Sequence, residues 1–286
     1  MFARSAVAVS TTALALAVLT GCGSESAPAP VAAPTQDDVT QPAWRIERIK
    51  ADCMKQKGFT YVPFVAPPQK QSELERKAVE GDYKAMKEFR TKYGFQIFAA
   101  HVYPDDPASG ALVPEAFATN PNDRILGSLN KTQFTAYQDA ENSCFDKGTQ
   151  EVLHKKASSR YDLATQLSEM TDQLTSREIA GDPKLVELAA PFGDCLKAKG
   201  YPVPFLTPTA LVIRGQEAFR AEEHKFGRGE NGSRPDLTPD QARPYLAREI
   251  KAALDDLECG KDFYAAYTPK KRELDLQVRR EFGGVF

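Results

Sequence analysis

Residues 195–205 read Cys-Leu-Lys-Ala-Lys-Gly-Tyr-Pro-Val-Pro-Phe, and residues 53–64 read Cys-Met-Lys-Gln-Lys-Gly-Phe-Thr-Tyr-Val-Pro-Phe. In both copies a Gly follows the Cys by five positions, an aromatic residue comes next, and Pro-Phe closes the segment. Apolar residues precede each Cys at steps of three and four, which places the Cys on the buried stripe of an amphipathic helix. The chain is therefore organised around one helical pattern that occurs twice.

The glycine of each copy, Gly58 and Gly200, stands where a helix should end. Gly adopts the left-handed conformation without the penalty of a Cβ atom, so it suits the residue just past a helix. The aromatic residue after each glycine would contact the residue five positions before that aromatic residue, Met54 for Phe59 and Leu196 for Tyr201, as in a Schellman cap. The lysines of the last turn favour the negative end of the helix. In an alternative interpretation, the lysines and aromatic residues bind a ligand.

The start of the chain predicts export. Arg4 supplies a positive charge, and residues 6–19 are apolar but too few to span a membrane as a mature helix. The segment ends Leu19-Thr20-Gly21-Cys22, which resembles the lipobox of bacterial lipoproteins, a family whose Cys becomes the first residue and carries the lipid. We expect residues 1–21 to be a signal peptide and Cys22 to be lipidated, at the extracytoplasmic face of the cell membrane. An ordinary signal peptide with an incidental Cys is the alternative.

The segment after Cys22 predicts a spacer, because residues 23–42 are rich in small residues and Pro and cannot build a core. We assign residues 22–42 to the lipid anchor and a disordered tether. The whole chain has 42% hydrophobic and 27% charged residues, which is typical of a soluble globular protein. Loss of the leader removes only Arg4 among the charged groups, so the formal charge falls from −2 to −3. This charge gives no basis for nucleic-acid binding, and the chain has no P-loop or dinucleotide fingerprint.

From residue 43 onward, helical periodicity and turn signals predict an all-α protein. It is made of two related helical halves, residues 43–156 and 157–286, with long Pro-rich irregular loops. Capping residues open several helices, at Ser72, Asp82, Asp182 and Thr238. Residues 95–102 could form a short strand. The expected helices are 43–57, 73–80, 83–92, one from about residue 131, 151–180, 183–199, 217–226, 239–259 and 270–282, and the Pro-rich loops are 59–71 and 202–209.

Four cysteines remain after Cys22, two in each half. An exported protein meets oxidants, so an even number of cysteines predicts disulfide bonds. Three pairings are possible, and the duplication favours Cys53–Cys144 and Cys195–Cys259, with one bond stapling each half. The alternative is a metal or redox site, but the chain has no C-x-x-C and no clustered His. We therefore predict neither a metal nor a cofactor.

Several motifs, taken in order, resemble a group of secreted proteins and lipoproteins from actinobacteria. They are the two Cys motifs above, Lys92-Tyr-Gly-Phe95, Asn122-Asp123 with Tyr137, Asp182-Pro183 and the segment from Glu249 to Cys259. The resemblance covers most of residues 45–285. It implies an exported location and a helical fold but no activity. This chain departs from the pattern at Leu196, where Met is usual, and in a short segment before Cys144.

The polar candidates for chemistry have simpler explanations. His101, His154 and His224 have no ligand spacing, and we expect each to be a surface or capping residue. Asp105 and Asp106 lie between prolines, so a turn explains them as well as a cation site does. The acidic group on the helix that holds Cys259 is more consistent with a solvated face than with an acid/base pair. That group is Asp255, Asp256 and Glu258.

Aromatic residues of the first half could line a groove for a sugar or peptide, although core packing is favoured. They are Trp44, Tyr61, Phe64, Tyr93, Phe95 and Phe98. No catalytic residue is predicted. The leading hypothesis is a membrane-anchored extracytoplasmic lipoprotein acting as a non-catalytic binding or interaction module, with the membrane as one partner and an envelope ligand or protein still to be identified. The alternative is a hydrolase of envelope polymers that uses carboxylates brought together by folding.

Overall fold

The computed structural model describes residues 41–66, 71–111, 119–229 and 234–285, and in these ranges every regular element is a helix. The predicted signal peptide, Cys22 and all but the last two residues of the tether lie outside the described residues. A compact unit spans Gln36–Phe286. It contains all the described helices, cores and disulfides, and therefore what a domain needs to fold.

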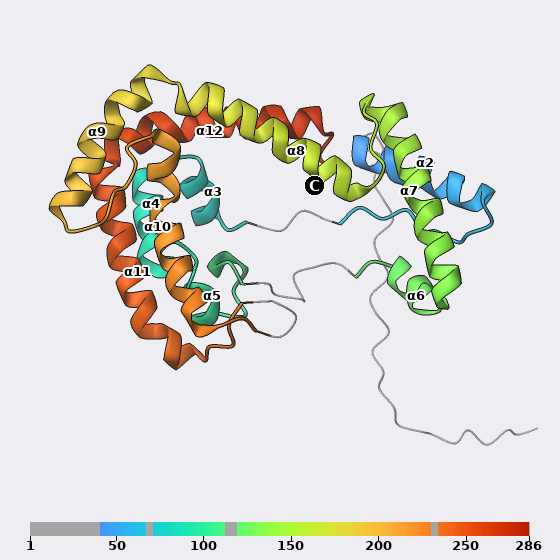
Figure 1. The fold of residues 1–286 in the computed structure, drawn as a ribbon, viewed down its shortest axis with the longest axis horizontal. Coiled ribbons are helices and arrows are strands. Elements are labelled where there is room, and N and C mark those ends of the chain that lie inside the picture. Colours follow the sequence, from blue (N-terminus) through green and yellow to red (C-terminus); the bar gives the residue numbers. More distant parts are fainter. Residues whose placement is uncertain (1–40, 67–70, 112–118, 230–233, 286) are drawn as a thin grey trace, which may run out of the picture. The chain divides into compact units, whose positions relative to one another are not determined.

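Figure 1 follows the helices in chain order. None of the described helices is long and apolar enough to cross a membrane. The elements are α2 (Pro42–Gln56), α3 (Glu73–Val79), α4 (Tyr83–Tyr93), α5 (Ala99–Val102), η1 (Pro107–Ser109), α6 (Asn122–Gly127), α7 (Lys131–Leu153), α8 (Arg160–Thr175), η3 (Ser176–Ala180), α9 (Pro183–Ala198), α10 (Pro208–Glu223), η4 (His224–Phe226), α11 (Pro239–Cys259) and α12 (Lys261–Glu281).

Both repeated motifs form the predicted Schellman cap. Gly58 has φ +83° and Gly200 has φ +86°. The backbone N–H of Phe59 donates to the carbonyl of Met54 at 2.9 Å. The same bond joins Tyr201 to Leu196 at 3.0 Å. The repeated residues therefore end α2 and α9 in the same way.

The predicted N-caps are also present. Ser72 opens α3 and Thr238 opens α11 with complete capping boxes, in which each side chain accepts an N–H from the residue three positions later. Asp82 and Asp182 accept the corresponding N–H groups at the start of α4 and α9. Local side-chain chemistry therefore determines where these helices begin.

The predicted strand at residues 95–102 is wrong. A carboxylate from α11, Glu249, accepts the backbone N–H groups of Phe95, Ile97 and Phe98 at 2.7, 2.9 and 2.8 Å. These donors bind one buried side chain instead of a neighbouring strand, so the segment turns and enters α5. Burial raises the pKa of Glu249, and the three N–H donors oppose that rise.

The predicted helix 151–180 is also wrong, because the chain breaks between α7 and α8. His154 ends α7 in the left-handed conformation, with φ +55°. Asp146 accepts the N–H of Ala157 at 2.8 Å and Ser159 caps α8, so the break is held by hydrogen bonds from both sides. A single π-helical turn, η3, then follows α8.

Two further helices begin earlier than predicted, at the expense of the predicted loops. Thr207 caps α10 and Pro208 occupies its first turn, so the Pro-rich loop ends before residue 208. Gly215 lies inside α10, where a Cβ atom would meet the ring of Phe95 at 2.2 Å. The last helix, α12, starts at Lys261 and contains Pro269.

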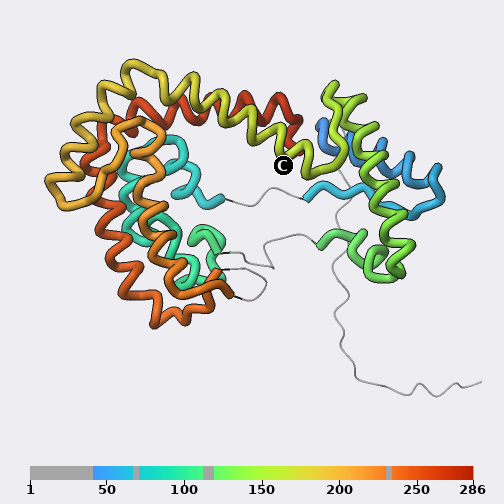
Figure 2. The backbone as a smooth tube through the Cα atoms, in the orientation of Figure 1, coloured from blue at the N-terminus to red at the C-terminus, as the bar shows by residue number. Residues whose placement is uncertain are grey.

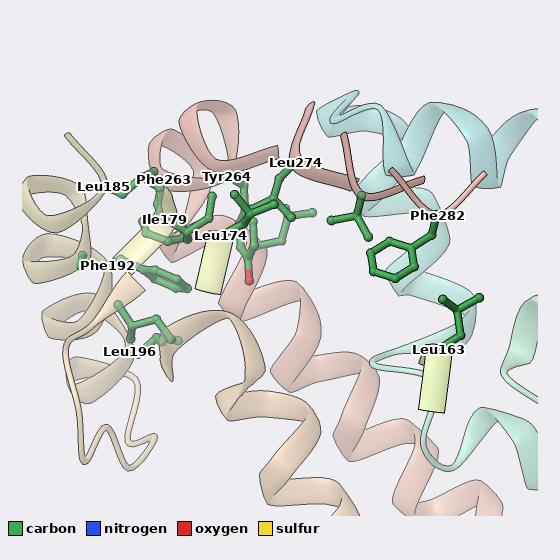
Figure 3. Close-up of a cluster of buried hydrophobic side chains, with 14 of the residues drawn as sticks. Leu163, Leu174, Ile179, Leu185, Phe192, Leu196, Phe263, Tyr264, Leu274 and Phe282 are labelled. Atoms are coloured by element: carbon green, nitrogen blue, oxygen red, sulfur yellow. The ribbon is translucent and has the colours of Figure 1, made fainter. Parts of the chain in front are cut away.

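The largest core joins η3, α8, α9 and α12. Phe192, Phe263 and Tyr264 pack together in it, with ring centroids 5.4 to 5.7 Å apart (Figure 3). Helices α8 and α12 pack against each other, as the backbone trace also shows (Figure 2). A second core surrounds Phe98, where α4 and α5 pack on α11. This packing crosses the predicted boundary at residue 156.

The cysteines form the predicted pairs. Cys53–Cys144 joins α2 to α7, and Cys195–Cys259 joins α9 to the end of α11. In each pair the Cα atoms lie 5.5 Å apart, inside the usual range for a disulfide. Each bond lies within one of the predicted halves.

Candidate functional site

The polar candidates from the sequence do not converge on one place. His101 lies against Glu223, with its Nε2 2.7 Å from the carboxylate and its side chain 8% exposed, so the surface or capping prediction is wrong for this residue. His154 caps α7 and His224 is exposed at the start of η4. Among the described residues, no three His, Cys, Asp or Glu side chains gather where they could hold a metal ion.

Asp106 belongs to a turn, as the simpler interpretation had it. Its carboxylate accepts the N–H of Ala108 at 3.1 Å and the hydroxyl of Tyr93 at 2.7 Å, and it pairs with Lys92 at 3.0 Å. Partial burial would raise the pKa of Asp106, but these hydrogen bonds outweigh it and lower the pKa. Its neighbour Asp105 is exposed.

The acidic group on α11 is not a solvated face, and that prediction is wrong for Asp256. The Asp256 side chain is 1% exposed and accepts a hydrogen bond from Arg90 at 2.8 Å and from the Tyr264 hydroxyl at 2.7 Å. Arg214 lies 3.5 Å away, with an Nε that has no hydrogen-bond partner. The negative charge of Asp256 thus faces the positive charges of two nearly buried guanidinium groups. These ion pairs connect α4 and α10 to α11.

A second buried polar cluster was not predicted. On α2, Glu47 is 2% exposed and Lys50 is 1% exposed, and the Lys50 ammonium lies 2.8 Å from Glu47 and 3.3 Å from Glu141 of α7. Glu47 also accepts the Tyr61 hydroxyl at 2.6 Å and pairs with Arg160 at 3.0 Å. Two cations balance two anions, so the cluster is neutral and connects four segments. Its sequence signal was the position of Lys50 on the same stripe as Ile46 and Cys53.

Tyr137 lies in the core that includes the Cys53–Cys144 bond, and its buried hydroxyl has no hydrogen-bond partner. Burial, with the negative charges of Glu141 and Glu47, raises its pKa to about 12. A phenol that holds its proton this firmly is no base. The oxygen atoms of Glu47 already have partners, and of the two carboxylates in the cluster only that of Glu141, 27% exposed, meets solvent.

The aromatic set does not form one groove. Tyr93, Phe95 and Phe98 are buried in the core on α11, as the favoured interpretation predicted. Tyr61 belongs to the Glu47 cluster, and the remaining two, Trp44 and Phe64, are half-buried. A ligand site must therefore be sought elsewhere.

Two adjoining hollows lie between α3, α4 and α12, and we call them together the α3 cleft. Their volumes are about 350 and 440 Å³, within the range of about 300–1,000 Å³ that is typical of small-molecule sites. They share Gln71, Ala78, Val79 and Met86. Arg90 and Phe89 line the first hollow, and one face of α12 lines the second.

The α12 face of the cleft changes in character along the helix. Tyr264 and Tyr267 lie at its first end, where burial raises the pKa of Tyr267 to about 12. Leu276, which is 46% exposed, follows between basic residues. The charged residues that line the second hollow are Arg76, Lys271, Arg272 and Arg279 against Glu80 and Asp275, an excess of two positive charges.

The opposite wall, α3, packs loosely. None of its residues is buried, and Val79 is 59% exposed although it lines both hollows. The helix is held by its capping box and by ion pairs of Arg76 with Glu80 and of Glu80 with Arg272. No sequence signal indicated the cleft, because its walls lie almost two hundred residues apart in the chain.

No family model, no curated protein and no solved structure matches the chain. The cleft is therefore interpreted from its own chemistry.

Proposed function

We propose that the protein is a membrane-anchored extracytoplasmic lipoprotein that acts as a non-catalytic binding module, with the α3 cleft as its ligand site. The observation that carries the proposal is the cleft itself, which combines exposed apolar side chains with a positively charged rim. Val79 and Leu276 remain 59% and 46% exposed inside a concave surface, where a ligand would cover them.

The chemistry of the lining supports binding rather than catalysis. The acids of the second hollow, Glu80 and Asp275, are ion-paired with Arg76 and Lys271. Tyr267 keeps its proton across the physiological range, because burial raises its pKa to about 12. A hollow whose acids are neutralised by neighbouring cations holds a ligand but offers no group poised to transfer a proton, and the acid that lines the first hollow, Glu75, is bonded in the capping box of α3.

The anchor is proposed from the sequence, through the Leu19-Thr20-Gly21-Cys22 motif. A lipid on Cys22 and a tether of about 20 residues would let the domain meet ligands within roughly 60 Å of the membrane, at about 3.1 Å per extended residue. Membrane and ligand would then be two separate partners of the protein.

Photo-crosslinking in the native envelope tests the site. A photoreactive amino acid replaces Val79 or Leu276 in the full-length protein, and Ile213 serves as a matched control because it is 50% exposed on α10 and does not line the cleft. We expect the same adduct mass at Val79 and Leu276 and its absence at Ile213. The same adducts at all three positions, or none at the two cleft positions, would contradict the proposed site.

An envelope-polymer hydrolase is the second candidate, and one observation favours it. Folding brings Glu47 and Glu141 to the same ammonium group, that of Lys50, although they stand 94 positions apart. Incubation with purified peptidoglycan and envelope polysaccharide tests this candidate. Release of soluble fragments by the natural protein, lost in Glu141→Gln, would replace the binding proposal with the enzymatic one.

A further inference from the structure

We propose that the ligand of the α3 cleft is an anionic single-chain amphiphile, a molecule with one acyl chain that ends in a phosphate or carboxylate group. This inference rests on the proposed function, because it assigns a ligand class to the same cleft. Three observations support it. They are the order of side chains along α12, the unequal pairing of the arginines that line the cleft, and the exposed apolar side chain of Val79 on α3.

The order of side chains along α12 gives the cleft a polarity. Its lining residues recur at steps of three and four, so they form a single helical face. The face begins at Tyr264 and ends at Arg279, a length of about 22 Å at about 1.5 Å per residue. Aromatic rings stand at one end, and the guanidinium groups of Arg272 and Arg279 stand near the middle and at the other end. An elongated ligand with an apolar tail and a charged head matches this order.

The arginines that line the second hollow, Arg76, Arg272 and Arg279, differ in how closely they pair with carboxylates. Glu80 receives two hydrogen bonds of 2.9 Å from Arg76, while Arg272 lies 3.6 Å from the same carboxylate. Arg279 has no ion pair with any residue that the structure describes. Arg272 and Arg279 are seven positions apart and therefore share one side of α12. A phosphate or carboxylate between them would receive the charge-assisted hydrogen bonds that Arg forms best.

Between these two arginines lies Leu276, and across the cleft lies Val79. About half of the surface of each residue is exposed to solvent. Burial of apolar surface is favourable at about 25 cal/mol per Å², so methylene groups of a ligand would gain by covering both residues. Since α3 has no buried residue of its own, it can adjust its position over an acyl chain without breaking a packed core.

Three probes separate the two parts of the proposed ligand. Dodecyl phosphate has a tail and an anion, dodecyl maltoside has the same tail without a charge, and inorganic phosphate has the anion alone. Each is titrated below its micelle concentration into the protein from residue 36 onward, the compact unit that holds every described helix and both disulfides. Circular dichroism confirms the helical fold of each variant before titration.

Two variants map the site. Arg272→Gln with Arg279→Gln removes the proposed headgroup contacts, and Arg177→Gln with Arg243→Gln removes the same charge at exposed positions outside the cleft. We expect dodecyl phosphate to bind at least tenfold more tightly than either other probe. The first double variant should lose at least tenfold in this affinity, and the second should change it less than twofold.

Other outcomes overturn the inference in distinguishable ways. Equal affinity for inorganic phosphate would make the cleft a simple anion site, and equal affinity for dodecyl maltoside would make it a neutral apolar site. Either result rejects the amphiphile while leaving the cleft as the binding site. Failure of all three probes also rejects the amphiphile, and the adducts at Val79 and Leu276 then decide the proposed function separately.

Discussion

The guanidinium group of Arg90 donates to the carboxylate of Asp256 at 2.8 Å, although the two residues stand 166 positions apart. Arg90 also bonds the carbonyl of Ala253 at 2.9 Å and lies over the ring of Tyr264. This contact fixes α4 against α11 and holds Arg90, which lines the first hollow of the α3 cleft. The wall of the proposed ligand site therefore depends on a buried ion pair.

Replacement of Asp256 by Asn should be strongly destabilising. The change leaves Arg90 and Arg214 buried without a counter-charge, and breaking one partner of a buried pair costs about 3–5 kcal/mol. Urea unfolding at neutral pH measures the loss. Glu258→Gln is the control on the same helix, because its side chain is 69% exposed and its loss should change stability by less than about 0.5 kcal/mol. Equal midpoints for both variants would contradict the role of Asp256.

The neighbouring Asp255 should make stability depend on pH. Partial burial would raise its pKa, but hydrogen bonds from Lys251, Tyr201 and Lys199 outweigh burial and hold the pKa well below its usual value of 3.8. A carboxyl group with a lowered folded pKa stabilises the fold above the unfolded pKa and loses that effect as the pH falls through the folded value. The stability difference between the natural protein and Asp255→Asn should therefore be largest near pH 7 and shrink below about pH 4.

Urea unfolding of both proteins at pH 7, 5 and 3 checks this expectation. The cations and the phenol that donate hydrogen bonds to Asp255 keep their protons over the whole range, so these donors do not change charge there. A difference that is constant from pH 7 to pH 3 would show that the hydrogen bonds act without the charge.

The helix starts could be predicted because their cause is local. Ser72, Asp82, Asp182 and Thr238 each bond an N–H three residues later, so a short window of sequence contains both partners. The same holds for the two Gly caps. Prediction failed where the partner is distant, as at residues 95–102, whose backbone donors bond Glu249 about 150 positions away. Periodicity alone contains no information about such a contact.

The α3 cleft was beyond sequence reasoning for the same reason. Val79 and Leu276 belong to helices that are far apart in the sequence, and only the fold brings both into the lining of one cleft. Asp256 was assigned to solvent because charged neighbours surround it in the sequence. In the structure these neighbouring acids of α11 differ in burial, since Asp256 is buried and Glu258 is exposed. Which residues of a helix are buried depends on the elements that pack against it in the fold.

Alanine at Gly58 or Gly200 should cost about 1 kcal/mol at each site, because both glycines have positive φ, which a Cβ atom disfavours. A Cβ atom would meet nothing within 4 Å at either position, so the cost is conformational and not a clash. Gly127→Ala is the matched control, since that site is equally open and is not among the positive-φ glycines. Unfolding midpoints should fall for the first two variants and stay constant or rise for the control.

Lipidation of Cys22 remains a prediction from the sequence. Cys22→Ala should abolish incorporation of a labelled fatty acid and release the protein from the membrane fraction, because stable anchoring requires the acyl chains. Ser24→Ala, which leaves the Leu19-Thr20-Gly21-Cys22 motif intact, should stay labelled and membrane-bound. Membrane retention of the Cys22→Ala protein at the natural level would reject the anchor.

The last prediction concerns the two disulfides, which should be present in the exported protein. Peptide mapping without reductant should recover Cys53 linked to Cys144 and Cys195 linked to Cys259, since an oxidising compartment favours bonds between cysteines that the fold brings together. The bonds close loops of 91 and 64 residues, for which the chain-entropy model gives at most about 4–5 kcal/mol each. Cys53→Ser with Cys144→Ser should therefore lower the urea midpoint and leave the Cys195–Cys259 peptide intact. A peptide linking Cys53 to Cys195 would reject this pairing and join the two repeated motifs covalently.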